Sequence, residues 1–246
     1  DLSASGNPFA RIPQLRAEFR RQVSDHTRFE WQVAAQDPNV GDYPAEFRTV
    51  RQPAVGERGR WPGFDARLGL TSSLDGREMS VGLSSHYTRG VNAGLIAGQA
   101  VKRSVDSWGV ALDYNLPLHS RVALSGELFT GRALGIYAVG VGQSVLPVGG
   151  GGEHGLEGHG GWLQAQFNLA PRWQLNLAYG QESSDGHELR TGDRSRNQTC
   201  MGNLLYKYSP HLTLGWEWRR FLTDYQNQRL ANERGDHLNL AVAYTF

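Results

Sequence analysis

Ionisable side chains recur at every second position in several short segments of the chain, for example at Arg16, Glu18 and Arg20. Alternate residues of an extended strand point to the same side, so such side chains would share one face of a sheet. Charged groups gathered on one face can attract ions and orient polar solutes. The candidate functional residues that fit this pattern are Arg16, Glu18, Arg20, Arg28, Glu30, Asp65, Arg67, Asp113, Glu127, Lys207, Glu217 and Arg219.

The candidate set is electrically balanced, with six basic and six acidic members. A hairpin turn at Asp25 would bring Arg20 opposite Glu30, a register that avoids like charges facing each other. If carboxylates neutralise the arginines in this way, a preference for anions would be weak, and the sign of any charge selectivity does not follow from the sequence. The alternative is a solvated strand face that selects nothing.

Ser84, Ser85 and His86 are the residues whose types suggest nucleophilic catalysis. On a strand, Ser85 and His86 would point to opposite sides, whereas Ser84 and His86 would share one side. No acidic partner and no Gly-x-Ser-x-Gly elbow accompanies them in the sequence, so we predict no catalytic residues.

A metal or cofactor site is not predicted either. His154, Glu157 and His159 lie in the glycine-rich run 149–161, and such a loop would hold metal ligands poorly. The single cysteine, Cys200, permits no internal disulfide and is expected to face lipid as a small apolar side chain. The formal net charge of +1 gives no indication of nucleic-acid binding.

Eleven segments alternate apolar and polar residues, which is the strand signature. The chain has 246 residues and a mean hydropathy of −0.48, and no apolar run approaches the roughly 20 residues that a membrane helix needs. A tilted strand of about 9–11 residues is nevertheless long enough to cross a bilayer. The predicted strands are Gln14–Gln22, Thr27–Gln36, Gly63–Ser72, Glu78–Tyr87, Ser107–Leu116, Arg121–Thr130, Gly161–Leu169, Trp173–Gln181, Gln198–Tyr208, Leu212–Phe221 and His237–Phe246.

The connections between these segments alternate between short turns and long stretches such as Thr88–Asp106. Short periplasmic turns and long outer loops are usual in transmembrane barrels, as are aromatic belts at both interfaces. These patterns predict an all-β, antiparallel transmembrane β-barrel. The predicted belts are Trp173, Tyr206, Tyr208, Tyr244 and Phe246 near short turns, and Tyr87, Trp108, Tyr179, Trp216 and Trp218 near long connections.

The last predicted strand ends on the aromatic Phe246, where the final strand of a barrel meets the membrane interface. That strand must end on the periplasmic side, so the first of the eleven strands runs toward the same side. Because bacterial barrels have even strand counts, residues 1–246 are expected to be the C-terminal portion of one barrel domain, with a signal peptide and further strands upstream. One missing strand would give 12 strands in total and five would give 16, and we favour 16.

One long connection, Asp37–Pro62, is rich in proline and arginine. It is longer than connections that only join two strands usually are, so we expect it to have a function of its own. It could fold into the barrel and narrow it. It could equally cap the outside of the barrel or latch onto a neighbouring subunit, and the sequence leaves both interpretations open.

Two hairpins, 203–218 and 169–175, and the ending Tyr244-Thr245-Phe246 resemble DcaP-like porins of the Gram-negative outer membrane. The resemblance implies a homotrimer of 16-stranded barrels that passes small hydrophilic, often anionic, solutes through a pore lined by the charged set. It also implies outer-membrane lipid around the barrel, recognition of Phe246 by the barrel-assembly machinery, and neither enzymatic activity nor a cofactor. The alternatives are an enzymatic or adhesive barrel and a soluble β-sandwich binding module.

Overall fold

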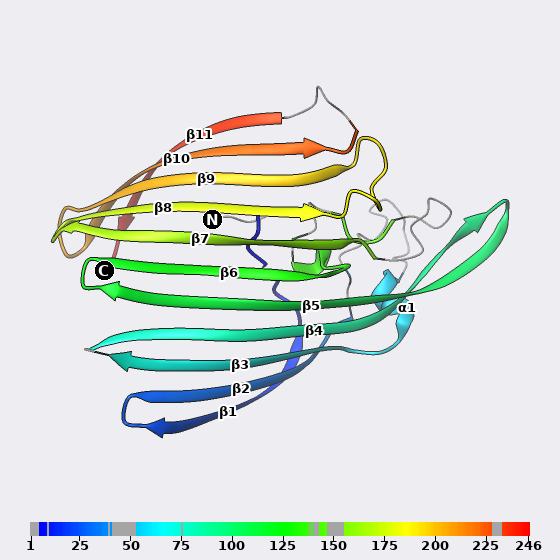
Figure 1. The fold of residues 1–246 in the computed structure, drawn as a ribbon, viewed down its shortest axis with the longest axis horizontal. Coiled ribbons are helices and arrows are strands. Elements are labelled where there is room, and N and C mark those ends of the chain that lie inside the picture. Colours follow the sequence, from blue (N-terminus) through cyan, green and yellow to red (C-terminus); the bar gives the residue numbers. More distant parts are fainter. Residues whose placement is uncertain are drawn as a thin grey trace.

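The computed structural model describes residues 5–8, 10–38, 40, 53–74, 76–137, 139, 143–146, 155–227 and 233–246. Within these residues, eleven strands form one antiparallel sheet in which each strand pairs with its neighbours in the sequence (Figure 1). All eleven predicted strands are therefore present. The strands are β1 (Gln14–Ser24), β2 (Thr27–Gln36), β3 (Gly63–Leu74), β4 (Arg77–Ile96), β5 (Gln99–His119), β6 (Val122–Arg132), β7 (Glu157–Ala170), β8 (Trp173–Ser184), β9 (Arg194–Lys207), β10 (Leu212–Tyr225) and β11 (Glu233–Tyr244).

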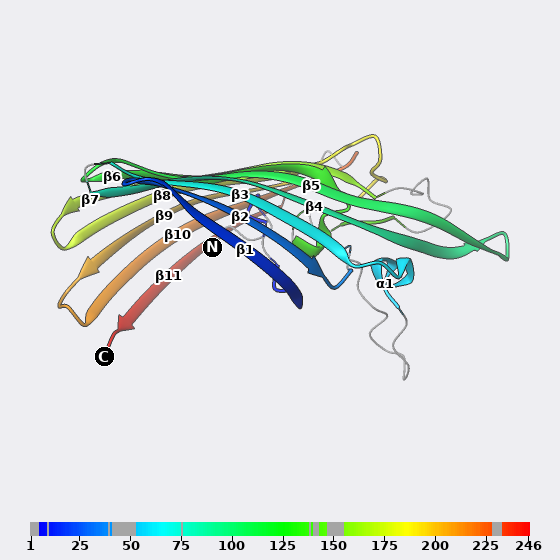
Figure 2. The ribbon, with the colours of Figure 1, turned by 90° about the horizontal axis from the view of Figure 1, so that it is seen from below.

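The sheet is a curved arch whose two faces carry different residues (Figure 2). The convex face holds the apolar members of the alternation. Leu68, Leu83 and Leu112, for example, are cross-strand partners on β3, β4 and β5, and each remains exposed. A large exposed apolar surface of this kind marks a protein or membrane interface.

The connection between β4 and β5 differs from the prediction. We expected a long loop over Thr88–Asp106, whereas the two strands continue as a paired hairpin that projects beyond the rest of the sheet (Figure 1). Ala97 and Gly98 form the turn with φ angles of 49° and 81°, because a two-residue I′ turn needs positive φ at both positions. The extension was missed because charged residues such as Arg89 and Asp106 replace the apolar residues at the convex positions.

Two short helical elements pack on the concave side: the helix α1 (Val55–Gly59) and the 3-10 turn η1 (Gly135–Tyr137). Val55 contacts Gly90 of β4, and Arg58 Nε donates a hydrogen bond of 2.7 Å to the carbonyl oxygen of Val91. Buried apolar clusters anchor both elements to the sheet. The first cluster is Val40, Val55, Val105 and Ala133, and the second is Phe129, Leu134 and Val139.

The connection Asp37–Pro62 is described at residues 37, 38, 40 and 53–62, and residues 39 and 41–52 lie outside the described residues. Val40 and Val55 belong to a cluster on the concave side, so these parts of the connection pack inside the arch. The chain before β1 also lies inside. Ser5 is buried, and its Oγ lies 2.6 Å from Thr199 Oγ1 on β9.

Aromatic residues mark both ends of the convex face, with one correction to the prediction. Trp173, next to a short turn, has its ring centroid 4.5 Å from Tyr206 and 6.5 Å from Trp216. We predicted Trp216 for the belt near the long connections. It belongs to the short-turn end instead, because the 14-residue β10 begins close to it. Tyr87 and Trp108 face each other at the opposite end.

β1 and β11 are the two edges of the sheet, and they do not pair with each other. The residues of both strands are exposed along their whole length. Since the described strands form a single sheet, the two packed sheets of a β-sandwich are not formed among them. Nor does any helix in the described ranges have the length and apolar character needed to cross a membrane.

Candidate functional site

The strand registers place the twelve predicted residues on one face of the sheet. Arg20 faces Glu30 across β1 and β2, and Asp113 faces Glu127 across β5 and β6. Asp65 is the register partner of His86, which lies on the face that η1 covers, so the shared face is the concave one. By strand, the residues are Arg16, Glu18 and Arg20 on β1; Arg28 and Glu30 on β2; Asp65 and Arg67 on β3; Asp113 on β5; Glu127 on β6; Lys207 on β9; and Glu217 and Arg219 on β10.

A first group of charges spans β1 and β2. Arg20 Nε donates to Glu30 Oε2 at 2.8 Å, so the predicted facing of these two residues is confirmed. Arg20 also pairs with Glu18, and Arg16 Nη2 lies 3.4 Å from Glu18 Oε2. Gln32 Nε2 donates to the same carboxylate oxygen at 3.3 Å. The two arginines therefore share two carboxylates, and the group carries little net charge.

A second group joins β3 to β5 across β4. Arg67 donates two hydrogen bonds to Asp113, one of them from Nη2 to Oδ2 at 2.8 Å, and Arg67 Nη1 donates to Ser84 Oγ at 3.1 Å. Gly82 of β4 lies between the two charged residues. A Cβ at this position would collide with the guanidinium group, so the glycine lets Arg67 reach Asp113. The pair is a fork-to-fork contact of the kind that fixes orientation as well as charge.

The remaining charges are distributed over β6, β9 and β10. Trp162 Nε1 lies 3.5 Å from Glu127 Oε2. Arg219 Nε donates to Glu217 Oε1 at 2.7 Å, and Asn239 Nδ2 of the edge strand donates to the same oxygen at 3.0 Å. By contrast, no described residue forms an ion pair with Arg28 or Lys207, the two basic residues of the predicted set that lie nearest the short turns.

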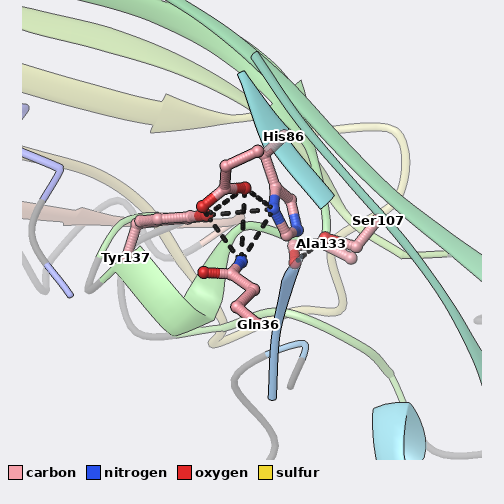
Figure 3. A network of polar contacts seen from close by, with 6 residues as sticks. Gln36, His86, Ser107, Ala133 and Tyr137 are labelled. Atoms are coloured by element: carbon pink, nitrogen blue, oxygen red, sulfur yellow. Dashed lines mark hydrogen bonds and ion pairs between the residues drawn. The ribbon is translucent and has the colours of Figure 1, made fainter. Parts of the chain in front are cut away.

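A polar network anchors η1 to the concave wall (Figure 3). His86 Nδ1 lies 2.7 Å from Asp65 Oδ1 and 2.9 Å from the Tyr137 hydroxyl oxygen. Gln36 Nε2 approaches the same ring nitrogen at 3.2 Å and donates to the Tyr137 hydroxyl at 3.1 Å. Burial, together with the nearby Asp65 charge, raises the pKa of Tyr137, so its hydroxyl stays protonated and donates to Asp65.

A cavity of about 360 Å³ lies beside this network, between the chain before β1, strands β1 to β6 and η1. This volume is within the range of small-molecule sites. Arg16, Arg67 and Glu127 contribute charges to its lining, while Phe129 and Leu134 contribute an apolar wall. The cavity therefore presents both charged and apolar surface.

The serine–histidine interpretation changes in one respect. We expected no acidic partner for His86, but Asp65 contacts its Nδ1 because the two residues are register partners on adjacent strands. A catalytic triad also needs a serine hydroxyl on Nε2. Ser84 shares the concave side with His86, yet its Oγ accepts a hydrogen bond from Arg67, and no hydrogen bond joins it to His86 among the described side chains.

No group of three His, Cys, Asp or Glu side chains that could hold a metal occurs within the described ranges. Of the three residues considered in the sequence, His154 lies outside those ranges, and Glu157 pairs with Arg132 on the convex side. Cys200 is free and lies on the convex side, where its register partner on β8 is Tyr179.

Several concave-side residues were not among the sequence-based candidates, and the largest side chains among them include Phe129, Tyr137 and Trp162. Phe129 alternates in phase with Glu127, and Trp162 is the register partner of Glu127, so strand phase alone places both on the concave face. Their apolar character hid them, because we read large apolar side chains as lipid-facing. Tyr137 lies in a connection, where strand periodicity gives no signal.

No protein-family model and no curated protein sequence matches the chain. Among solved structures, it is similar to the anion-selective porin from Comamonas acidovorans, with a TM-score of 0.54 and 11% sequence identity. The match covers 94% of this chain but 59% of the porin, so the chain spans well under two thirds of that protein.

Two further solved structures align at lower TM-scores. The FrpB iron transporter from Neisseria meningitidis aligns with a TM-score of 0.48 and 9% identity, over 94% of this chain and 42% of the transporter. The Pseudomonas putida toluene transporter TodX aligns with a TM-score of 0.33 and 12% identity, over 95% of this chain and 81% of the transporter. Since these two scores are below 0.5, the porin is the one of these three structures that bears on the fold. The chain has an all-β antiparallel fold of the outer-membrane β-barrel type.

Proposed function

We propose that this chain is the larger, C-terminal portion of one barrel domain of an outer-membrane porin, and that it passes small hydrophilic solutes by passive diffusion. The observation that carries the proposal is the division between the two faces of the sheet. One face is apolar and bordered by aromatic residues, and the other carries the twelve charged side chains. When such a sheet closes with its charged face inward, the lumen is polar and fills with water.

The two free edges of the sheet support a larger barrel. In lipid, the unpaired backbone groups of β1 and β11 would be too costly to leave exposed, so further strands should pair with them. Apolar residues continue on the convex side up to both edges, as at Phe19 and Leu240. We therefore keep the prediction of 16 strands, because a barrel of about 16 strands leaves an aqueous channel whereas one of about eight is filled by side chains.

The segments inside the arch would narrow the channel and filter solutes by width. η1 and α1 both lie on the concave side, and the contact of Tyr137 with Asp65 and His86 holds η1 against the wall. A solute that passes these segments meets the ion pair of Arg67 with Asp113 on the same wall. Opposite charges at fixed positions create a transverse field that orients polar solutes.

Charge selectivity is proposed to be weak. Most basic residues of the wall share a carboxylate, as Arg20 does with Glu30, so their fields cancel at short range. Arg28 and Lys207 are the basic residues of the set without such a partner among the described residues, and they lie near the short turns. Any attraction for anions would come from these two residues.

The remaining features are proposed from the resemblance to DcaP-like porins: a homotrimer in the outer membrane of a Gram-negative bacterium, with no enzymatic function. Phe246 is fully exposed beyond the end of β11, which supports its proposed recognition by the barrel-assembly machinery.

The experiment that tests this function is a liposome-swelling assay on the protein with its upstream strands, using neutral, anionic and cationic solutes of graded size. Swelling rates should fall steeply with solute width and differ little between anions and cations of equal size. A folded barrel that inserts into the liposomes without allowing any solute to enter would contradict the proposal and would favour a plugged, adhesive or enzymatic barrel.

A further inference from the structure

Glu127 differs from the other acidic residues of the predicted set, because no described residue forms an ion pair with its carboxylate. Trp162 Nε1 approaches Glu127 Oε2 at 3.5 Å, which is longer than the usual hydrogen-bond range of about 2.7–3.2 Å. The other carboxylate oxygen, Oε1, accepts no hydrogen bond within the part of the chain that the structure describes. The carboxylate of Glu127 therefore has an oxygen available for a further donor.

A second carboxylate lies directly opposite Glu127. Asp113 on β5 is its cross-strand register partner, and both side chains point to the concave side. Like charges that face each other across a sheet are destabilising. Arg67 forms its fork-to-fork pair with Asp113, so this group has one guanidinium for two carboxylates. One negative charge of the three side chains is left unbalanced, and the position therefore favours a cation.

The Glu127 side chain also lines the cavity of about 360 Å³ beside η1. Phe129, which follows on the same face of β6, forms an apolar wall there together with Leu134 and Val139. Leu134 packs closely on the sheet, because a Cβ at Gly109 would come within 2.9 Å of its side chain. The volume is near the lower end of the range for small-molecule sites. The cavity is thus suited to a small ligand with one charged end and one apolar end.

The positive charges that line the cavity already have carboxylate partners. Both terminal nitrogens of Arg67 donate to Asp113, and Arg16 Nη2 lies 3.4 Å from Glu18 Oε2. An anionic ligand would have to compete with these partners. A cationic group, in contrast, can use the available oxygen of Glu127.

Asp65 is the other acidic residue of the lining, and its oxygens are engaged in the network that anchors η1. The Tyr137 hydroxyl donates to Asp65 Oδ1 at 3.1 Å, and His86 Nδ1 lies 2.7 Å from the same oxygen. Of the two lining carboxylates, Glu127 is therefore the one placed to hold a ligand.

We propose that the cavity binds a small organic ammonium ion that carries an apolar group, with the ammonium on Glu127 and the apolar group against Phe129 and Leu134. An ammonium–carboxylate contact is a charge-assisted hydrogen bond. The inference rests on the proposed porin function and deepens it, because it names a class of solute that the channel retains. Inorganic cations and sugars lack the apolar group, so they pass without being retained.

Equilibrium dialysis of the complete barrel in detergent tests the site without requiring conduction. The probe is phenethylammonium, and two reference probes each lack one of its features. The anion 3-phenylpropionate keeps the ring and reverses the charge, whereas ethylammonium keeps the charge and lacks the ring. The wild type should bind phenethylammonium about tenfold more tightly than either reference probe, because each loses one class of contact.

Glu127→Gln should weaken the binding of phenethylammonium by about tenfold, because the charge-assisted contact is lost. This variant should fold as well as the wild type, since it removes a like charge opposite Asp113. Ala111→Leu is a second variant, which should weaken binding by filling part of the cavity. Glu217→Gln is the matched control, because Glu217 is a concave carboxylate that already pairs with Arg219, and it should bind like the wild type.

Unchanged binding in Glu127→Gln would overturn the proposal. Equally tight binding of 3-phenylpropionate or of ethylammonium by the wild type would overturn it as well, because the charge or the apolar wall would then have no role. Equal weakening in Glu217→Gln would also contradict it, since it would indicate attraction by the overall charge of the lumen.

Single-channel currents in potassium chloride separate this proposal from the porin function. If the wild type conducts and binds no phenethylammonium, the failure counts against the cavity site alone. If the folded wild type passes no current, the porin function fails, and the dialysis data still decide whether the cavity holds the ammonium ion. When both hold, added phenethylammonium should reduce the current of the wild type more than that of Glu127→Gln.

Discussion

The hydroxyl of Tyr137 lies 3.1 Å from Asp65 Oδ1, although 72 residues separate the two in the sequence. This hydrogen bond joins the segment after β6 to the concave wall of β3, and His86 of β4 takes part through its Nδ1. The position of the segment inside the arch thus depends on a small polar network as well as on apolar packing. Single substitutions can remove individual hydrogen-bond donors or acceptors from this network.

Tyr137→Phe removes the hydroxyl and leaves Asp65 without this donor. Loss of a buried hydrogen bond costs about 1–3 kcal/mol, so the segment should leave the wall part of the time. We expect noisier single-channel currents with a changed open conductance, whereas the folded fraction stays high. Tyr114→Phe, which removes an outward hydroxyl on β5, is the matched control, and equal currents in both variants would contradict the anchoring role.

The pair of Arg67 with Asp113 allows a test of charge selectivity in both directions. Asp113→Asn leaves the Arg67 charge uncompensated and should shift the reversal potential in a salt gradient toward anion preference. Arg67→Gln should shift it toward cation preference. A unit charge a few ångströms from an ion in water contributes about 1 kcal/mol, which corresponds to roughly a fivefold change in local ion concentration. Shifts of the same sign in both variants would refute the assignment of this pair to the channel wall.

Arg28 and Lys207 are predicted to supply what anion attraction the channel has. Arg28→Gln together with Lys207→Gln should therefore reduce the permeability to anions more than Arg20→Gln does, because Arg20 is already paired with Glu18 and Glu30. The measurement is the ratio of chloride to potassium permeability. A larger effect of the Arg20 change would show that pairing does not control selectivity.

Leu83 and Ser84 are neighbours in β4 that point to opposite faces of the sheet. An arginine on the lipid face of a barrel costs about 2–4 kcal/mol near the bilayer midplane, so Leu83→Arg should lower the yield of folded, heat-modifiable barrel. Ser84→Arg should fold normally and lower the conductance by adding volume to the lumen. If the two variants fold equally well in lipid, the convex face is not the membrane face.

The strand positions followed from the sequence because period-two alternation reports directly which face each residue takes. The pairing of Arg20 with Glu30 followed too, from a hairpin centred on Asp25. The structure reaches this register through the turn Asp25-His26 together with a β-bulge between Gln22 and Ser24. The extension of β4 and β5 past Tyr87 did not follow, because charged residues such as Arg89 and Asp106 occupy its convex positions in place of apolar ones. The hydropathy pattern of this part of the two strands therefore resembles that of a loop.

The concave site was only partly predictable for a related reason. Charged residues such as Arg67 and Asp113 could be assigned to one face, but their contact across β4 depends on the space left at Gly82. The acidic partner of His86 was missed because Asp65 lies on a different strand and meets it through register alone. Tyr137 enters the site from a connection, where only tertiary packing determines the position.

Single-channel recording in planar bilayers, on the protein with its upstream strands, tests the central claim most directly. The account predicts stable conductance steps, grouped in threes for a trimer, with a small reversal potential under a salt gradient. A correctly folded, heat-modifiable barrel that inserts and passes no current would contradict it.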